Sequence, residues 1–357
     1  MELTHGQRIP GSRTADFDYT LDPAQIAQHP SERRDRSKLL IVERHSGELR
    51  HAHFADLVDM IPAGDVLTLN TTRVIRARLL GTRDSAAGAG AEVLLLKAVP
   101  GDDERTFEAL VHPGGKLHPP RRVHVADDLS VEIVAITDRR TRIVRLHTPL
   151  SVDAALAKYG HVPLPPYIER VDTPVDSERY QTVYASEAGS VAAPTAGLHF
   201  TQELLGRLTS RGVQRADVLL HVGAGTFKPV ERDDPAEHLM HEEWYSIGES
   251  AANRINAARE AGSKIWAVGT TTVRTLESAV GPDGRIEAKT GETRLFIRPP
   301  FTFRAVDRLI TNFHLPRSTL LMLVAAFAGY ELTMQAYHVA IEHGYRFYSY
   351  GDAMVIL

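Results

Sequence analysis

The chain has 357 residues, of which 43% are hydrophobic and 24% are charged, and it contains no cysteine. Such a length and composition are typical of a folded protein with two domains, and the lack of cysteine excludes disulfides, thiolate metal sites and thiol nucleophiles. The formal net charge of −4 argues against a domain that binds nucleic acid through overall positive charge, so any such contact must be local.

The N-terminal residues 1–14 mix charged residues with Gly and Pro and lack the apolar stretch of a secretory signal, so we expect a disordered leader. The longest apolar run, Leu320–Ala328, has about half the ~20 residues that a membrane-spanning helix needs. We therefore expect a buried helix there, no membrane partner and a cytoplasmic protein.

Residues 66–149 are predicted to form a small β-barrel domain. Short β-rich runs alternate with turn signals such as Gly88-Ala89-Gly90 and Pro113-Gly114-Gly115, and no helical period of useful length interrupts them. The runs are 66–69, 76–80, 92–99, 107–112, 122–125, 131–136 and 143–146.

After Leu150 the pattern changes to strands that alternate with longer amphipathic helices, which indicates an α/β layer structure. Helices are predicted at 201–211, 249–261, 273–280, after Pro316 and at 332–343, and strands at 216–222, 265–268 and 353–357. Residues 39–42 are expected to add one more strand. The predicted fold class is a mixed-sheet α/β domain, residues 1–65 and 150–357, with the barrel inserted into it.

Ligands of open α/β sheets bind beyond the carboxyl ends of the strands, so the residues after each predicted strand are the first candidates. His221 ends one strand, and Gly223, Gly225 and Thr226 follow it. Glycines allow a ligand to approach the backbone closely, which favours a binding site. A tight turn that holds a hydrogen-bonded structural histidine explains the pattern equally well.

The run Gly269-Thr270-Thr271-Thr272 leads from another strand directly into a helix that also carries Arg274. Free backbone N–H groups and hydroxyls at the positive end of a helix suit a carboxylate or a phosphate. Helix capping alone accounts for one of the threonines, so anion binding and plain capping both remain open.

Two further segments offer polar groups to a pocket. The small-residue loop 189–200 suits close approach to a flat ligand, although a packed loop is the alternative, and it carries Ser190, Thr195 and His199. Asn312 and His314 follow a predicted strand, and Asp352 lies near the C-terminus.

A metal site is not expected. His238 and His241 have a spacing that two helical ligands can use, but no metalloprotease pattern is met and no third ligand is evident. Signatures of P-loop enzymes, nucleophile-elbow hydrolases and kinases are absent from the sequence.

Six motifs together resemble the S-adenosylmethionine:tRNA ribosyltransferase-isomerase family of queuosine biosynthesis, and they span nearly the whole chain. They are GSVAAPTAGLHFT at 189–201, HVGAGTF at 221–227, MHEEWY at 240–245, VGTTTVRTLES at 268–278, LITNFHLPRSTLLMLV at 309–324 and YRFYSYGDAM at 345–354.

The resemblance implies an α/β domain with an inserted β-barrel and two substrates, S-adenosylmethionine and a tRNA that carries 7-aminomethyl-7-deazaguanine at the wobble position. The ribosyl group would be transferred to the aminomethyl nitrogen and isomerised to give epoxyqueuosine, with release of adenine and methionine. S-adenosylmethionine would be consumed as a substrate, so no cofactor is expected, and we expect a monomer.

This chemistry needs a base for a ribose proton, an acid for the departing adenine and a pocket for the methionine carboxylate. We assign proton transfer to His221 or His314, and orientation or charge balance to Asp352 or Glu243. The carboxylate is assigned to residues 269–272 with Arg274. Substrate contacts are expected at Ser190, Thr195, His199, Gly223, Gly225, Thr226, Gly269, Thr270, Thr271, Thr272, Arg274 and Asn312.

For tRNA, basic residues in or beside the barrel are expected to contact phosphates, although a solvated surface carries such charges routinely. They are Arg73, Arg76, Arg78, Arg140 and Arg142. Two alternatives remain open: an S-adenosylmethionine-dependent RNA methyltransferase, whose common glycine-rich loop is missing, and a non-catalytic RNA-binding module, which the acidic balance disfavours.

Overall fold

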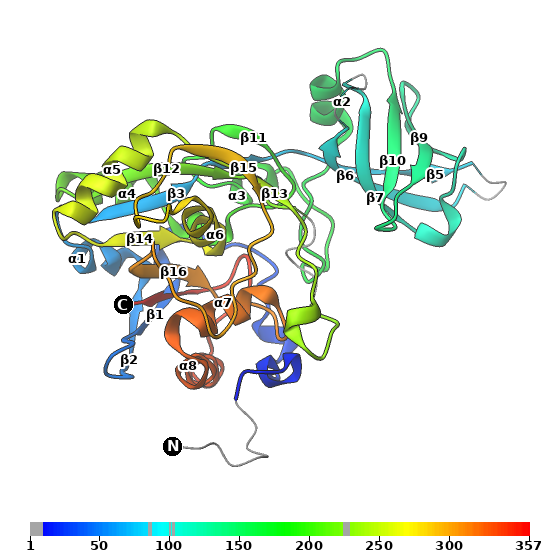
Figure 1. Cartoon of the computed structure of the whole chain (residues 1–357). Helices are drawn as coiled ribbons and strands as arrows, with labels where there is room; N and C mark the ends of the chain where they lie inside the picture. Colours follow the sequence, from blue (N-terminus) through cyan, green and yellow to red (C-terminus); the bar gives the residue numbers. More distant parts are fainter. Residues whose placement is uncertain (1–9, 85–87, 100, 102–103, 224–228) are drawn as a thin grey trace.

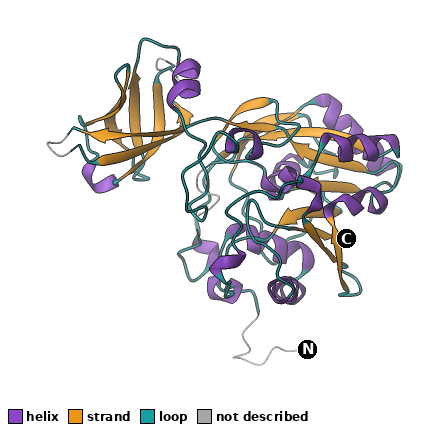
Figure 2. Ribbon diagram, turned by 180° about the vertical axis from the view of Figure 1, so that it is seen from behind, coloured by secondary structure: helices purple, strands orange, loops and turns teal. Residues whose placement is uncertain are grey.

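The computed structural model describes residues 10–84, 88–99, 101, 104–223 and 229–357. Figure 1 shows an α/β body with a β-barrel standing beside it, and Figure 2 shows the same separation from behind. The predicted fold class, an α/β domain with a small inserted barrel, is therefore confirmed.

The body is built on a nine-stranded mixed sheet in the order β15-β13-β12-β3-β14-β16-β17-β1-β2. The central strands β12, β3, β14 and β16 run parallel, so their carboxyl ends meet at one edge of the sheet. The strand bounds are β1 Lys38–Val42, β2 Leu49–His53, β3 Val66–Asn70, β12 Gln214–Leu220, β13 Glu243–Ile247, β14 Ile265–Val268, β15 Lys289–Thr293, β16 Arg308–Asn312 and β17 Ala353–Ile356.

Helices cover both faces of this sheet because successive strand residues point to opposite faces. Ala216 and Val218 of β12 pack into the core beneath α5 to α8, whereas Leu67 and Leu69 of β3 pack into the core beneath α1 and α4. The helix bounds are α1 Leu57–Met60, α3 Asp176–Arg179, α4 Gln202–Ser210, α5 Glu249–Glu260, α6 Thr270–Ala279, α7 Thr319–Ala328 and α8 Tyr330–Glu342.

The barrel closes in the order β10-β7-β6-β5-β8-β9. Its interior is filled by alternate apolar side chains such as Val93, Val131 and Val144, and helix α2 (Val152–Tyr159) packs Ala155 and Leu156 against the same core. The strand bounds are β5 Arg78–Arg83, β6 Gly90–Ala98, β7 Thr106–His112, β8 Arg122–Ala126, β9 Leu129–Ile136 and β10 Arg142–His147.

Two expectations about these segments are wrong. The run at 66–69, predicted as the first barrel strand, is β3, which lies between β12 and β14 in the body sheet. All five residues of β3 are buried, and a short apolar run of this kind does not reveal which sheet it joins. The end of the expected leader is ordered, because the Thr14 N–H donates to the Asp233 carbonyl and Tyr330 packs against Gly11.

The barrel joins the body through two chain crossings that hydrogen-bond to each other. The N–H groups of Arg78 and His161 each donate to the carbonyl of the other, at 3.3 and 2.7 Å. Gly160 lies so close that a Cβ there would be 2.0 Å from the Arg76 carbonyl oxygen. A short parallel ladder of β4 (Thr72–Val74) and β11 (Glu187–Ser190) continues the junction.

In the described part of the chain, no single helix has the length and apolar character of a membrane span. The helices α7 and α8 meet that criterion only as a pair, bent by 114° between them.

Arg142 belongs to the barrel structure and not to the expected tRNA-contacting set. Its side chain is buried, with 6% of the residue exposed, and its guanidinium donates to the carbonyls of Gly114, Leu117 and Arg140 at 2.7–2.9 Å. The donors are used to hold the loop before β8, so they are not available to phosphates.

We predict that Arg142→Ala destabilises the protein by about 3 kcal/mol, because it leaves buried carbonyls without donors. Arg140→Ala, in the adjacent exposed position, is the matched control and is expected to change the free energy of unfolding by less than about 0.5 kcal/mol. Urea unfolding followed by circular dichroism measures both. Equal effects of the two substitutions would contradict this assignment.

Candidate functional site

Three adjoining cavities lie where the parallel strands end. The enclosed cavity, about 30 Å³, is lined by residues of the loops after β14 and β16 and of the loop 193–196. The interdomain cavity, about 330 Å³, lies between the barrel and the body, and the arginine cavity, about 20 Å³, contains Arg274. Val222 lines the first two, and Leu320 lines both the enclosed and the arginine cavity.

The N-terminus of α6 opens into the enclosed cavity, through Gly269, Thr270 and Thr271. Gly269 adopts φ +86°, which a glycine tolerates readily, and no side chain caps the helix. The first-turn N–H groups have no acceptor inside the helix, and the three threonines of that turn are buried. Uncapped donors at the positive end of a buried helix form a site for an anion.

Asn312 adds a hydrogen-bond acceptor to the same cavity. Its Nδ2 donates to the carbonyls of Tyr348 and Asp352, at 3.2 and 3.3 Å, which fixes the orientation of the amide because a carbonyl only accepts. Its Oδ1 is buried and has no hydrogen-bond partner in the described residues, and only 1% of the residue is exposed. A buried acceptor without a donor is costly, so this atom points to a ligand that donates.

His314 lies against the enclosed cavity as a neutral imidazole. Its Nε2 lies 2.9 Å from the Thr311 hydroxyl, and its backbone N–H donates to the Tyr337 hydroxyl at 2.8 Å. Burial lowers the pKa of His314 to about 3.

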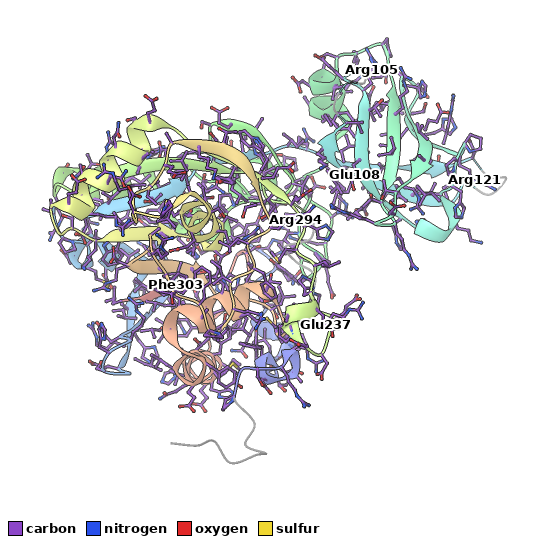
Figure 3. All side chains as sticks on the ribbon, viewed as in Figure 1. Arg105, Glu108, Arg121, Glu237, Arg294 and Phe303 are labelled. Atoms are coloured by element: carbon purple, nitrogen blue, oxygen red, sulfur yellow. The ribbon has the colours of Figure 1, made fainter. Side chains whose placement is uncertain are left out.

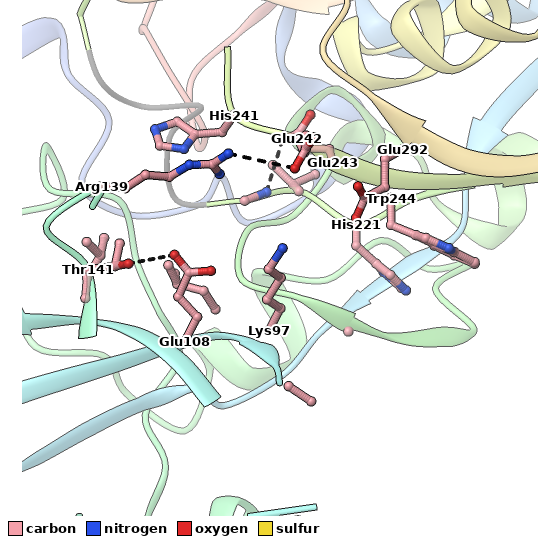
Figure 4. Close-up of a pocket in the computed structure, with 16 residues that line it drawn as sticks. Lys97, Glu108, Arg139, Thr141, His221, His241, Glu242, Glu243, Trp244 and Glu292 are labelled. Carbon is pink, nitrogen blue, oxygen red and sulfur yellow. Dashed lines mark hydrogen bonds and ion pairs between the residues drawn. The ribbon is translucent and has the colours of Figure 1, made fainter. Parts of the chain in front are cut away.

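His221 lies in the interdomain cavity (Figure 4). Its Nδ1 is 2.9 Å from the Thr72 hydroxyl, its ring stacks on Trp244 with centroids 5.1 Å apart, and no hydrogen bond to its Nε2 is seen among the described residues. A Cβ on Gly189 would lie 2.8 Å from the ring, so the glycine makes room for it. Burial lowers the pKa of His221, which keeps the imidazole neutral and able to accept a proton near pH 7.

Glu243 and Arg274 form a buried ion pair that joins β13 to α6. The Glu243 carboxylate also accepts from the Gly223 N–H at 3.1 Å, so it ties down the loop that follows β12. Among the described residues, Arg274 Nη2 has no hydrogen-bond partner. The pair therefore fixes the geometry between the cavities and leaves one guanidinium donor available.

Charged side chains from both domains face each other across the interdomain cavity. Figure 3 shows Glu108 of the barrel and Arg294 of the body on opposite sides of the junction. Glu242 bridges the two sides, because it pairs with Arg294 and lies 3.8 Å from Arg139 of the barrel (Figure 4). The barrel therefore forms one wall of the site.

Several sequence candidates lie in these cavities, and others do not. Thr195 and Asn312 line the enclosed cavity, and Gly223 lines the interdomain cavity. Thr272 bonds back to the Val268 carbonyl, which is a helix contact. Gly225 and Thr226 lie outside the described residues.

Ser190, His199 and Asp352 have structural contacts, and none of the three lines the enclosed or the interdomain cavity. The Ser190 hydroxyl accepts from the Val222 N–H and donates to the Ala192 carbonyl. The carboxylate of Asp352 accepts the N–H groups of Lys38 and Arg346, at 2.9 and 2.8 Å. Buried polar groups at strand ends must find partners, and here the backbone supplies them.

His199 is held between Ser37 and Asn312. Because Asn312 Nδ2 donates to its Nε2, the proton of this imidazole lies on Nδ1 and is donated to the Ser37 hydroxyl at 2.7 Å. Burial lowers the pKa of His199 to about 3.

The remaining arginines expected to contact tRNA lie around the junction. Arg73 and Arg76 donate to the carbonyls of Ala185 and Ala157, Arg78 forms an ion pair with Glu92 at 2.8 Å, and Arg140 is exposed. Arg73, Arg76 and Arg140 are the three of this set that are exposed and have no carboxylate partner among the described residues.

Sequence reasoning missed Trp244 and Glu292, which line the interdomain cavity with His221. The MHEEWY motif contains Trp244 and could have indicated it as a site residue, whereas no sequence pattern pointed to Glu292. Within the described ranges no group of three or more metal-ligating side chains occurs, and His238 and His241 do not lie on a helix.

Comparison with known proteins places the chain among relatives of similar length. A family model described as "Queuosine biosynthesis protein" matches residues 14–356. The S-adenosylmethionine:tRNA ribosyltransferase-isomerase of Symbiobacterium thermophilum is 51% identical over 347 residues, covering 97% of this chain and 100% of its own. That of Moorella thermoacetica is 51% identical over 353 residues, with coverage of 97% and 100%.

A solved structure is similar along almost the whole chain. The crystal structure of S-adenosylmethionine tRNA ribosyltransferase from Thermotoga maritima is 38% identical, covers 96% of this chain and 99% of its own, and superposes with a TM-score of 0.55.

We predict that His199 makes the fold sensitive to acid. Its pKa is about 3 in the folded protein and near 6.5 when unfolded, so stability is complete above pH 6.5 and falls as the unfolded state takes up a proton. Between pH 7 and pH 5 this histidine alone removes about 2 kcal/mol. The difference in unfolding free energy between the parent and His199→Asn should shrink by that amount over this range in urea titrations. A difference that does not depend on pH would contradict the prediction.

Proposed function

Since the chain belongs to the queuosine biosynthesis family, we propose that it transfers the ribosyl group of S-adenosylmethionine to 7-aminomethyl-7-deazaguanine at the wobble position of tRNA. The group is isomerised to give epoxyqueuosine, and adenine and methionine leave. The observation that carries the proposal is a small cavity with unsatisfied donors and an unsatisfied acceptor, directly beside the larger cavity between the two domains.

The enclosed cavity suits the amino-acid head of S-adenosylmethionine. The uncapped N–H groups of α6 bind the carboxylate, and Asn312 Oδ1 accepts from the ammonium group. Arg274 lies in the adjoining cavity and its charge is matched by Glu243, so it supports this site electrostatically while the helix donors hold the carboxylate.

His221 is the group that removes the ribose proton acidified by the sulfonium. Its Nε2 has no partner in the described structure, its pKa is lowered, and its neighbour Val222 lines the enclosed cavity as well. His314, whose Nε2 already contacts Thr311, is assigned to the cavity wall and not to proton transfer. No cofactor is needed, because S-adenosylmethionine is the substrate.

The interdomain cavity takes the tRNA base, and the barrel and junction contact the surrounding phosphates. We propose that Arg73, Arg76 and Arg140 make such contacts and that the protein acts as a monomer in the cytoplasm, where tRNA is modified.

We predict that His221→Ala lowers the rate of adenine release by about 100-fold or more, the usual contribution of general base catalysis. Gly189→Ala should produce a similar loss, because its Cβ displaces the His221 ring. Gly47→Ala is the matched control: it also has positive φ, but a Cβ there meets no other atom within 4 Å. Chromatography of adenine from S-adenosylmethionine and precursor-bearing tRNA measures the rate. A His221→Ala rate within about threefold of the parent would remove His221 from proton transfer.

We also predict that Arg73→Glu and Arg140→Glu each raise the dissociation constant for tRNA and reduce the slope of log K against log salt by roughly one, as loss of a phosphate contact requires. Arg211→Glu serves as the control, because Arg211 precedes the amino end of β12 at the opposite edge of the sheet. Fluorescence anisotropy at several salt concentrations provides the measurement. An unchanged slope for both variants would rule out this surface.

A further inference from the structure

Three side chains form a row across neighbouring strands at the outer edge of the body sheet. Trp244 of β13 is the Cα partner of Glu292 of β15, and the His221 N–H donates to the Trp244 carbonyl at 3.0 Å. Side chains alternate along a strand, so the buried neighbours Glu243 and Tyr245 point inward while Trp244 points into the interdomain cavity.

The row offers an aromatic platform. The rings of His221 and Trp244 are inclined by only 18°, and Trp244 is 38% exposed although it is a large apolar residue. Leu96 and Leu110 of the barrel line the same cavity. A volume of about 330 Å³ lies within the range of roughly 300–1,000 Å³ that small-molecule sites occupy. An exposed aromatic face inside such a cavity suits a flat ring that stacks on it.

Glu292 is the carboxylate of this cavity that remains available. Glu108 accepts from the Thr141 hydroxyl at 2.6 Å, Glu242 pairs with Arg139 and Arg294, and Glu243 pairs with Arg274. For Glu292, no ion pair or side-chain hydrogen bond is seen in the described ranges. An ionised carboxylate accepts only, so its ligand must donate.

This inference rests on the proposed function. We propose that the wobble base binds to this row of side chains after it is flipped out of the anticodon. The 7-deazaguanine ring extends the stack on Trp244, and its N1–H and 2-amino groups donate to Glu292. His221 covers one face of the Trp244 indole, so the base stacks on the other face, and its opposite edge, which carries the aminomethyl group, points away from the sheet into the interdomain cavity.

The dimensions and the chemistry of the row agree with this orientation. Glu292 is one strand spacing from Trp244, about 4.8 Å, so a base stacked on the free face of Trp244 lies over this carboxylate. A carboxylate discriminates against adenine, whose N1 accepts, because two acceptors repel and neither is satisfied. Glu292 thereby selects guanine-type bases, while Trp244 holds any flat ring.

Tryptophan fluorescence tests base binding directly. The chain has two tryptophans, and the other, Trp266, is buried with its indole N–H bonded to Asp65. Titration with free 7-aminomethyl-7-deazaguanine should quench the emission of the parent, and Trp244→Phe should lose that quenching. Adenine should quench at least tenfold more weakly. Unquenched parent emission, or quenching retained in Trp244→Phe, would overturn the proposal.

Kinetics separate this inference from the proposed function. Trp244→Leu should lower kcat/KM for precursor-bearing tRNA by about 5- to 150-fold, the range that base stacking supplies, and Glu292→Gln by at least tenfold. Thr290→Ala, on the same strand and face but outside the cavity, should leave it unchanged. If the parent releases adenine and both variants match it, this inference fails alone. If the parent releases no adenine from any precursor-bearing tRNA, the proposed function fails first.

Discussion

The buried ion pair between Glu243 and Arg274 is the constraint on which the geometry of the site depends. Two charges withdrawn from water must meet each other, and removal of one partner typically costs about 3–5 kcal/mol. The pair fixes the inward direction of one β13 side chain, so the next residue, Trp244, must point outward. It also holds the Gly223 N–H through the same carboxylate and so positions the chain directly after His221. Helix α6 is anchored at the turn after its uncapped end, which keeps those donors facing the enclosed cavity.

The enclosed cavity and the interdomain cavity differ in size and polarity. The enclosed cavity has space for a small charged group. Its donors are the backbone N–H groups of α6, and its acceptor is the side-chain amide of Asn312, whose orientation is fixed by hydrogen bonds. The interdomain one is larger, carries the aromatic Trp244 on the body side, and mixes apolar and charged side chains on the barrel side. The proposed reaction, between a small sulfonium compound and one base of a large RNA, fits such a pair of compartments, with proton transfer proposed at the boundary next to Val222, which lines both cavities. His221 lies there because β12 ends at that point.

Much of the fold was predictable because strand ends carry glycine, threonine and histidine in recognisable order. The strand 265–268 is where the pattern placed it, whereas the helix predicted at 273–280 begins three residues earlier, at Thr270, so the threonines form its first turn. Where the structure gives candidate site residues other contacts than expected, the cause is common: residue type alone does not reveal which group a side chain will bond. Asp352 and His199 resemble site residues but are satisfied by backbone and by Asn312, and Arg142 resembles a surface cation but holds a loop. Trp244 and Glu292 become neighbours only through strand pairing between distant segments.

The edge strands of the body sheet also affect whether two copies of the protein can associate by pairing their strands. Its two outermost strands, β15 and β2, have the sequences KTGET and LRHAH, and the barrel is closed on itself. Charged and polar edge strands disfavour pairing with a strand of another molecule. Such edge-to-edge pairing is a common route to aggregation of β-sheet proteins. Assembly by sheet extension is therefore disfavoured at both borders of the body sheet.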